Sequence, residues 1–484
     1  MQKKHCFFRI IVIFGLIACF LSLSCKRDRI NSNGNAYLSF SDNLILFDTV
    51  FTTVGSVTQM FRVRNPYKSV LKTNIALIGG STSFFSVNVD GASGTMFREI
   101  EIPPQDSIFI FVKVNINPNG GNVPLLITDT LAFFTNGNRQ NVELIAFGED
   151  AHFIVPDRTI QLGSSQLHYK IVAAEGEHIT WTNEKPYVIY GCAVVDSTAK
   201  LTINPGTQIY LHKNGILWVY KGGCLHVNGT KDHEVVFQGD RRAFAYSNDY
   251  AQWDRIWINE GSQDNIINYA VIKNAYIGIQ AEIMNRSMGN KLILTNTLIK
   301  CSQKIGFLGR SYSVEAYNNV IADCREFCLL LAQGGNYTFS NNTIYNHYSS
   351  SGRTTPSAFF SNYYEVSDGS QIIRYMGDFK CDFTNNIVYG NASTEFGCSK
   401  TNEVDFKLNV ENCLLKIKSD ILSELTFYSA LILNQDPLIR ESLKYDFHLQ
   451  DNSPCKSAGK NIPQPTQDIT GTVRNNPPSI GAYE

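Results

Sequence analysis

The chain has 484 residues and carries 42 Lys and Arg against 43 Asp and Glu, for a formal net charge of −1. This balance gives no electrostatic reason to bind nucleic acid, because phosphate contacts need clustered Lys and Arg. The length allows two or three domains. Gly, Asn, Thr, Tyr and Phe are plentiful and no long stretch has helical periodicity, so the sequence predicts an all-β protein.

Residues 1–24 have the pattern of a targeting signal. Lys3, Lys4 and Arg9 precede the apolar run IIVIFGLIACFLSLS. This run is short for a membrane-spanning helix and is followed by polar sequence. We therefore expect these residues to take no part in the fold.

Two cysteines of this region are candidates for lipidation. Cys19 follows the more usual lipobox spelling, but cleavage there would leave FLSLS at the mature end, whereas the polar KRDR follows Cys25. The segment resembles the signal peptide of a bacterial lipoprotein. The resemblance implies acyl chains on Cys25, a tether over residues 25–36, and a place at the bacterial outer membrane or cell surface. Plain secretion is the alternative.

Residues 37–150 are predicted to form seven or eight short strands, each ending at Gly, Pro, Asn or Asp. Evenly spaced strands without helices favour an immunoglobulin-like β-sandwich. The stretches FRVRN, IPPQDSIFIFVKVNINP and DTLAFFTNG are similar to Ig-like modules of ciliary and bacterial surface proteins. We expect this domain to be a spacer, with a protein-binding module as the alternative. Residues 151–184 are expected to link it to the next domain.

A short phrase recurs five times in the second half of the chain: TNTLIK from Thr295, YNNVIAD from Tyr317, SNNTIYN from Ser340, TNNIVYG from Thr384 and ENCLLK from Glu411. The first asparagines of the phrases are Asn296, Asn318, Asn341, Asn385 and Asn412, at intervals of 22, 23, 44 and 27 residues. The third interval is twice the first. A period of this size predicts stacked units that cannot bury their apolar faces alone.

The residues around each asparagine explain the stacking. An alternating strand precedes it, and two positions beyond it four of the five phrases return an apolar residue: Leu298, Val320, Ile387 and Leu414. In a parallel β-helix, identical positions of successive coils stack at about 4.8 Å. A buried amide left unbonded costs roughly 1–3 kcal/mol. Because asparagine carries both a donor and an acceptor, the five asparagines are predicted to form a bonded ladder at an inner bend.

These phrases resemble the asparagine ladder of right-handed parallel β-helices of the pectate-lyase-like type. The resemblance covers residues 185–440, and the ending SPCKSAGKNIPQPTQDITGTVRNNPPSIGAYE, within residues 441–484, is similar to the closing coil and cap of bacterial surface β-helix proteins. Lyases, hydrolases, adhesins and coat proteins share this architecture, so it says little about function.

Nine cysteines follow Cys25, at 192, 224, 301, 324, 328, 381, 398, 413 and 455. The odd number leaves at least one unpaired within a monomer. Cys324 and Cys328 have the wrong spacing for a zinc knuckle and no histidine is close by in sequence. We expect most of the nine to pack as small apolar side chains, and we expect neither a metal nor a cofactor.

The sequence contains no acid–base set of the polygalacturonase or pectate-lyase kind, yet two regions have the composition of a ligand site. Long excursions from a repeat are often functional. Residues 347–380 occupy the doubled interval and gather His347, Arg353, Tyr363, Tyr364, Arg374 and Tyr375. Alternatively, Phe359 and Phe360 merely pin the excursion, and His347 is a corner-packed residue in line with Cys301 and Cys324.

The second region is residues 241–258, where Trp253 and Trp257 are four apart and predicted to share one face. The alternative places Trp257 in the core and Trp253 over an edge. The predicted function is non-catalytic binding of glycan or a partner surface by these aromatic loops. A polysaccharide lyase or glycoside hydrolase acting on an acidic polysaccharide is one alternative, and a purely structural surface protein is another.

Overall fold

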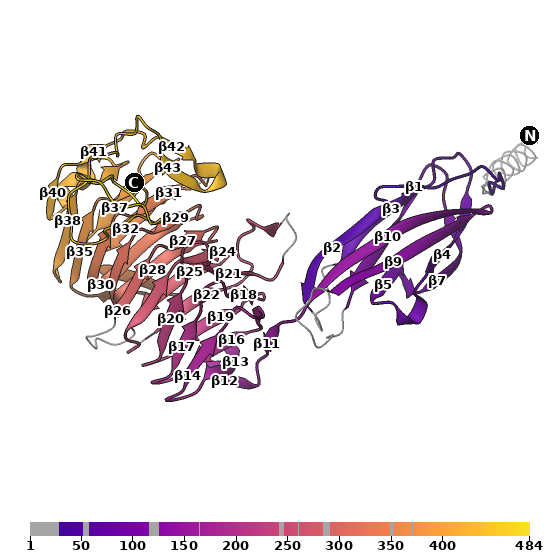
Figure 1. The fold of residues 1–484 in the computed structure, drawn as a ribbon, viewed down its shortest axis with the longest axis horizontal. Helices are drawn as coiled ribbons and strands as arrows, with labels where there is room; N and C mark the ends of the chain where they lie inside the picture. The colour runs from indigo at the N-terminus through magenta and orange to yellow at the C-terminus, as the bar shows by residue number, and fades with distance from the viewer. Residues whose placement is uncertain are drawn as a thin grey trace, which may run out of the picture. The chain divides into compact units, whose positions relative to one another are not determined.

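The computed structural model describes residues 29–51, 58–115, 125–163, 165–241, 246–259, 261–283, 291–348, 353–369 and 371–484. The predicted signal peptide and Cys25 lie outside these residues. The chain divides into two compact units, Met1–Glu149 and Asp150–Glu484 (Figure 1). In the part of the chain that the structure describes, no helix has the length and apolarity needed to cross a bilayer.

The first unit contains two five-stranded sheets. One has the order β1 (Ser39–Phe40), β3 (Gln59–Arg64), β8 (Ser107–Val114), β5 (Phe85–Val89) and β6 (Ala92–Gly94). The other has the order β2 (Leu44–Phe51), β10 (Asn138–Glu149), β9 (Leu125–Thr135), β4 (Leu71–Leu77) and β7 (Met96–Ile102), with the 3-10 turn η1 (Gly80–Thr82) after β4. Strand β2 pairs with β10 in parallel, whereas the other strand pairs are antiparallel.

The two sheets of this unit share one hydrophobic core. Strand β8, SIFIFVKV, shows why: its residues alternate between buried and exposed, as a strand with one face in a core requires. Phe61 of β3 and Phe133 of β9 bring their rings to 6.5 Å across the core, and Phe47 of β2 and Phe85 of β5 approach to 5.7 Å.

The second unit contains two long sheets, one of 11 and one of 18 strands among the described residues. The 11-stranded sheet runs β11 (His152–Ile154), β15 (Tyr187–Ile189), β18 (Gln208–Leu211), β21 (Val235–Gly239), β24 (Ala270–Lys273), β27 (Leu298–Lys300), β29 (Val320–Ala322), β31 (Thr343–Asn346), β36 (Ile387–Gly390), β39 (Leu414–Leu415) and β41 (Ile432–Leu433).

The 18-stranded sheet contains β12 (Arg158–Leu162), β13 (Ser165–Ala173), β14 (His178–Trp181), β16 (Cys192–Val195), β17 (Lys200–Ile203), β19 (Ile216–Val219), β20 (Cys224–Asn228), β22 (Arg255–Ile258), β23 (Asn265–Asn268), β25 (Ile277–Glu282), β26 (Lys291–Thr295), β28 (Ile305–Tyr317), β30 (Phe327–Ser340), β32 (Ala358–Ser361), β35 (Phe379–Thr384), β37 (Phe396–Ser399), β38 (Phe406–Glu411) and β40 (Phe427–Ser429).

The chain visits these sheets in a regular order. One strand of the 11-stranded sheet, such as β15, is followed by two of the 18-stranded sheet, β16 and β17, before the chain returns at β18. Apart from β12 with β13, the strand pairs described in the two sheets are parallel, for example β17 with β20 and β15 with β18. The predicted all-β class is therefore confirmed, with long parallel sheets. The expected linker, residues 151–184, contains β11 to β14 of these sheets.

The interior of this unit is built from columns of equivalent residues. Leu294, Ala316, Phe339, Phe383 and Val410 pair with one another in register along successive strands, and all five are buried. Each strand places every second side chain inside, so the apolar residues that precede each predicted asparagine fill the core. Figure 1 shows these strands following one another along the unit in chain order.

The predicted asparagines bond to one another in part, because the Asn318 amide donates to Asn296 at 3.1 Å and the Asn385 amide donates to Asn341 at 3.3 Å, and a second ladder lies one position further along. The predicted residues Asn296, Asn318, Asn341, Asn385 and Asn412 all have left-handed backbone, with φ between 47° and 58°. This turn interrupts the strand alternation, so the next residue points inward. This second ladder, the inward one, consists of Asn319, Asn342 and Asn386: the Asn319 amide donates to Asn342 at 2.9 Å, and the Asn342 amide donates to Asn386 at 2.9 Å.

Four of the predicted asparagines, Asn318, Asn341, Asn385 and Asn412, also hold the C-terminal segment, residues 455–484. The Asn318 side chain donates to the Gln467 carbonyl at 2.7 Å and accepts from Arg474 at 2.7 Å, and Asn385 donates to the Lys460 carbonyl at 2.8 Å. Before this segment lie the 3-10 turns η3 (Ser419–Glu424) and η4 (Ser442–Lys444) and the hairpin of β42 (Ile439–Glu441) and β43 (Asp446–Leu449).

The nine cysteines within the described residues are free thiols, and all except Cys224 are buried. Burial raises the pKa of the Cys413 thiol and of the Cys455 thiol to about 12 each. These side chains are therefore protonated at neutral pH, as expected for small apolar residues in a core.

Candidate functional site

Trp253, predicted to bind ligand, lies in the hydrophobic interior. It is 1% exposed, and its indole N–H donates to the Lys273 carbonyl at 2.8 Å. Strand β22 begins only at Arg255, so the alternation that was expected to put Trp253 and Trp257 on one face does not extend back to Trp253. The alternative prediction, with Trp257 in the core and Trp253 over an edge, is the reverse of what the structure shows, because Trp257 lies on the outer face.

Arg353 is also unavailable to a ligand. Its guanidinium forms a two-point ion pair with Glu395, with distances of 2.9 Å and 2.6 Å. The two side chains are 3% and 0% exposed. Glu395 accepts further hydrogen bonds from the backbone N–H groups of Ser357 and Ala392. The arginine that the sequence assigned to ligand binding therefore holds the excursion of residues 347–380 to the residue that directly precedes β37.

After β32, the excursion includes an antiparallel hairpin of β33 (Tyr363–Asp368) and β34 (Gln371–Met376). Tyr363 hydrogen-bonds Ser399 at 2.8 Å, and Arg374 lies over the Tyr363 ring while it pairs with Glu365 at 2.7 Å. Tyr375 is 47% exposed and is free to meet a ligand. The four predicted hairpin residues are therefore close together, but three of them are already engaged with neighbours.

Trp257 and Tyr364 were predicted as ligand residues from different regions of the sequence. They are linked through Glu282 and Arg310, which the sequence did not assign to a site. The Trp257 indole donates to Glu282 at 2.8 Å, and Arg310 forms an ion pair with the same carboxylate. Arg310 also lies 4.7 Å above the Tyr364 ring. Burial lowers the pKa of the Arg310 guanidinium. Glu282 and Arg310 lie on different strands, so the sequence gives no signal of their pairing without knowledge of which strands are neighbours.

His347 lies at a separate corner of the unit, where its Nε2 is 3.7 Å from Asp323 Oδ2. Among the described residues, no group of three or more His, Cys, Asp or Glu side chains is arranged to hold a metal ion.

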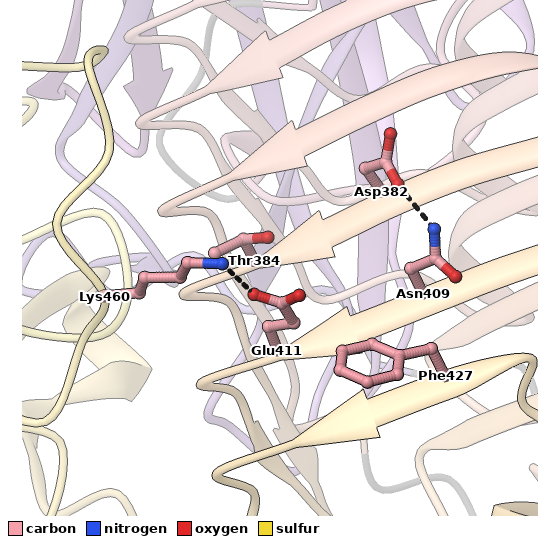
Figure 2. Close-up of a pocket in the computed structure, with 6 residues that line it drawn as sticks. All are labelled: Asp382, Thr384, Asn409, Glu411, Phe427 and Lys460. Atoms are coloured by element: carbon pink, nitrogen blue, oxygen red, sulfur yellow. Dashed lines mark hydrogen bonds and ion pairs between the residues drawn. The ribbon is translucent and has the colours of Figure 1, made fainter.

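A shallow pocket of about 300 Å³ opens on the outer face of the 18-stranded sheet (Figure 2). Its position follows from strand register, because Asp382 pairs with Asn409, Thr384 with Glu411, and Asn409 with Phe427. The residues between them, such as Phe383 and Val410, point into the core. The lining consists of Asp382 and Thr384 of β35, Asn409 and Glu411 of β38, Phe427 of β40 and Lys460 of the C-terminal segment.

The pocket combines one exposed aromatic ring with polar groups of both charges. Phe427 is 50% exposed. Beside it, the Asn409 amide donates to Asp382 at 2.8 Å, and Lys460 pairs with Glu411. Figure 2 shows these two pairs on either side of the pocket. A flat apolar surface next to carboxylate, amide and hydroxyl groups can pack against a sugar ring and bond its hydroxyls.

None of the six pocket residues was assigned to a ligand site from the sequence. Asn409 and Glu411 lie in β38, which ends at the first residue of the fifth repeated phrase, at positions that alternate with core residues. Their outward direction was readable from the alternation. Their proximity to Lys460, 49 residues beyond Glu411, was not.

The comparisons with known proteins leave the family open. No protein-family model and no curated protein matches the chain. The solved structures that it resembles include an ASH/PapD-like domain of human CEP192, 10% identical, with a TM-score of 0.17 over 26% of this chain and 94% of that one. A family 123 glycoside hydrolase from Clostridium perfringens is 8% identical, with a TM-score of 0.20 over 26% of this chain and 29% of that one.

A third structure, a protein of unknown function from Porphyromonas gingivalis W83, is 13% identical, with a TM-score of 0.18 over 29% of this chain and 59% of that one. The chain thus spans less than two thirds of the last two proteins. TM-scores of this size carry no argument about fold or function, which leaves the residues themselves as the basis for a proposal.

Proposed function

We propose that the chain is a lipoprotein anchored through Cys25 at a bacterial outer membrane or cell surface. In this proposal the first unit is an Ig-like β-sandwich that acts as a spacer. The second unit is a right-handed parallel β-helix of the pectate-lyase-like type. The proposal is supported by the signal sequence, by the repeated asparagine phrases, and by the parallel register of β26, β28, β30, β35 and β38.

We further propose that the β-helix binds glycan without catalysis, in the pocket of Figure 2. The observation that carries this proposal is the exposed Phe427 ring beside Asp382, Asn409 and Glu411. Sugar sites typically pair an aromatic surface with a few polar groups that fix orientation. Hydrogen bonds already hold the polar groups in place, so little conformational freedom is lost on binding.

The same hydrogen bonds favour binding over hydrolysis. Glycoside hydrolysis needs one protonated carboxyl group as proton donor and a second carboxylate as base or nucleophile. Here Asp382 accepts from Asn409, and Glu411 pairs with Lys460. Both carboxylates therefore act as acceptors, and neither is presented as a proton donor.

Replacing Phe427 by Ala is expected to weaken glycan binding about tenfold or more, because the apolar contact of one aromatic ring is lost. A glycan array would identify a ligand, and isothermal titration calorimetry would then measure its affinity for the full chain and the variant. Tyr428 is the matched control, since it is adjacent, equally exposed at 50%, and outside the pocket lining.

We expect Tyr428→Ala to bind as the unchanged chain does. Equal loss in both variants, or no loss in Phe427→Ala, would count against the pocket. The absence of any glycan ligand for the unchanged chain would count against glycan binding itself.

The catalytic alternative, a polysaccharide lyase or glycoside hydrolase, is favoured by one observation, which is that Asp382 and Glu411 line the same pocket. Incubation with acidic polysaccharides separates the alternatives. A lyase would generate unsaturated products that absorb in the ultraviolet, a hydrolase would generate reducing ends, and a purely structural protein would neither bind nor cleave.

A further inference from the structure

Two lysines lie side by side on the outer face of the 11-stranded sheet. Lys273 of β24 and Lys300 of β27 are register partners on adjacent strands, which places their backbones about 4.8 Å apart. Like charges directly opposite each other in a sheet are destabilising. Both side chains are also partly buried, and burial lowers the pKa of each ammonium group.

The chain contains a second lysine pair that shows what is missing here. Lys380 and Lys407 are also register partners, but each has a carboxylate, with Asp382 at 3.6 Å and Asp405 at 3.1 Å. Within the described residues, Lys273 and Lys300 form no ion pair. The Lys300 ammonium instead lies 3.4 Å from the centre of the Tyr445 ring.

Asp323 is an acidic group that acts on Lys300, but its carboxylate is bonded elsewhere. Its Oδ2 accepts the Tyr445 hydroxyl at 2.8 Å and lies 3.7 Å from His347 Nε2. The Cys301 thiol contacts the same Tyr445 hydroxyl at 3.1 Å. Asp323 thus acts on Lys300 and His347, and the adjacent Lys273 adds a positive charge that has no ion-pair partner among the described residues.

One further observation indicates a site. His347 Nδ1 is buried and has no hydrogen-bond partner among the described residues.

We propose that Lys273 and Lys300, with His347 beside them, form a binding site for an oxyanion: the carboxylate, sulfate or phosphate group of a ligand. The anion would lie across the two ammonium groups and relieve their repulsion, and His347 Nδ1 would accept a hydrogen bond from a ligand hydroxyl. This site lies on a different sheet from the pocket of Figure 2 and does not depend on it.

The test uses the full chain and its Lys273→Met and Lys300→Met variants, singly and together. The probes are inorganic sulfate, inorganic phosphate, a uronic-acid trisaccharide, a sulfated trisaccharide and a neutral trisaccharide, each measured by calorimetry. We expect the anionic probes to bind and the neutral one not to bind at this site. Each substitution should weaken anion binding at least about tenfold, the loss of one charge-assisted hydrogen bond.

The probes also distinguish the source of the anion. If the uronic-acid or the sulfated trisaccharide binds much more tightly than inorganic sulfate and phosphate, the site belongs to an anionic glycan. If the inorganic ions bind as tightly as these trisaccharides, the site belongs to a free oxyanion. The double variant Lys380→Met/Lys407→Met is the matched control and should bind inorganic sulfate and phosphate as the unchanged chain does. Anion binding that persists in the Lys273→Met/Lys300→Met chain, or no anion binding by the unchanged chain, would overturn the proposal.

Thermal unfolding in anion-free buffer provides a readout that needs no ligand. Removing one charge of a repelling pair should raise the melting temperature of the Lys273→Met chain by about 1–3 °C. Added sulfate should then stabilise the unchanged chain more than this variant. A lower melting temperature for Lys273→Met without anion would contradict the repulsion from which the site is inferred.

Discussion

Replacing Glu395 by Ala is expected to lower the free energy of unfolding of the second unit by about 3–5 kcal/mol. The substitution leaves the Arg353 guanidinium, whose side chain is 3% exposed, inside the protein without its counter-charge. It also removes the acceptor of the Ser357 and Ala392 backbone N–H groups. An uncompensated buried charge is among the most destabilising single changes.

Urea unfolding followed by fluorescence would measure this loss in the full chain. Glu365→Ala is the matched control, because Glu365 also pairs with an arginine, Arg374, but both side chains are well exposed, at 39% and 45%. An exposed pair contributes about 0–1 kcal/mol. The double variant Arg353→Met/Glu395→Leu should recover part of the loss, since no unpaired charge remains. Equal effects of Glu395→Ala and Glu365→Ala would refute a structural role for the buried pair.

The second large effect is expected at the inward amide ladder. The Asn342 side chain donates to Asn386 at 2.9 Å and to the Ala316 carbonyl at 3.1 Å, and its oxygen accepts the Asn319 side chain and backbone N–H. Asn342→Ala would leave several buried polar groups unpaired, at about 1–3 kcal/mol each where water cannot enter. We expect a total loss of about 3–5 kcal/mol in the free energy of unfolding.

The neighbouring Asn341 is the control for this position. Its left-handed backbone, with φ of 55°, suits glycine, and its amide makes longer bonds of 3.2 Å to the Ser479 carbonyl and 3.3 Å to the Asn385 side chain. Asn341→Gly should therefore cost only about 1–2 kcal/mol. Hydrogen exchange would add a second distinction. Asn342→Ala should expose amides of β29 and β31, whereas Asn341→Gly should loosen the C-terminal segment. If Asn341→Gly lost more free energy of unfolding than Asn342→Ala, the main stabilising ladder would be the predicted column that contains Asn341.

The ligand residues show why a composition-based prediction of a site succeeds only in part. Tyr363, Tyr364, Arg374 and Tyr375 come together because a single hairpin carries them. Trp253 and Arg353 were assigned by the same reasoning, yet one lies in the core and the other in a buried ion pair. The sequence shows the same aromatic or charged residue whether its side chain lies in the core or on the surface. Only its neighbours in the folded structure decide whether it is exposed.

By itself the sequence determined the all-β class, the recurring strands of the second unit and the inward direction of residues such as Ala316 and Phe339, because strand alternation is a local property of the backbone. It did not reveal the inward ladder of Asn319, Asn342 and Asn386, since that ladder depends on a left-handed turn at the preceding asparagine. Only the tertiary structure brought Lys460 to Glu411 and Tyr445 to Lys300. It also joined Arg310 to Trp257 through Glu282, and placed Arg310 over the Tyr364 ring. Those contacts join residues 25 to 145 positions apart, and their proximity is set by the register of stacked strands and the path of the C-terminal segment.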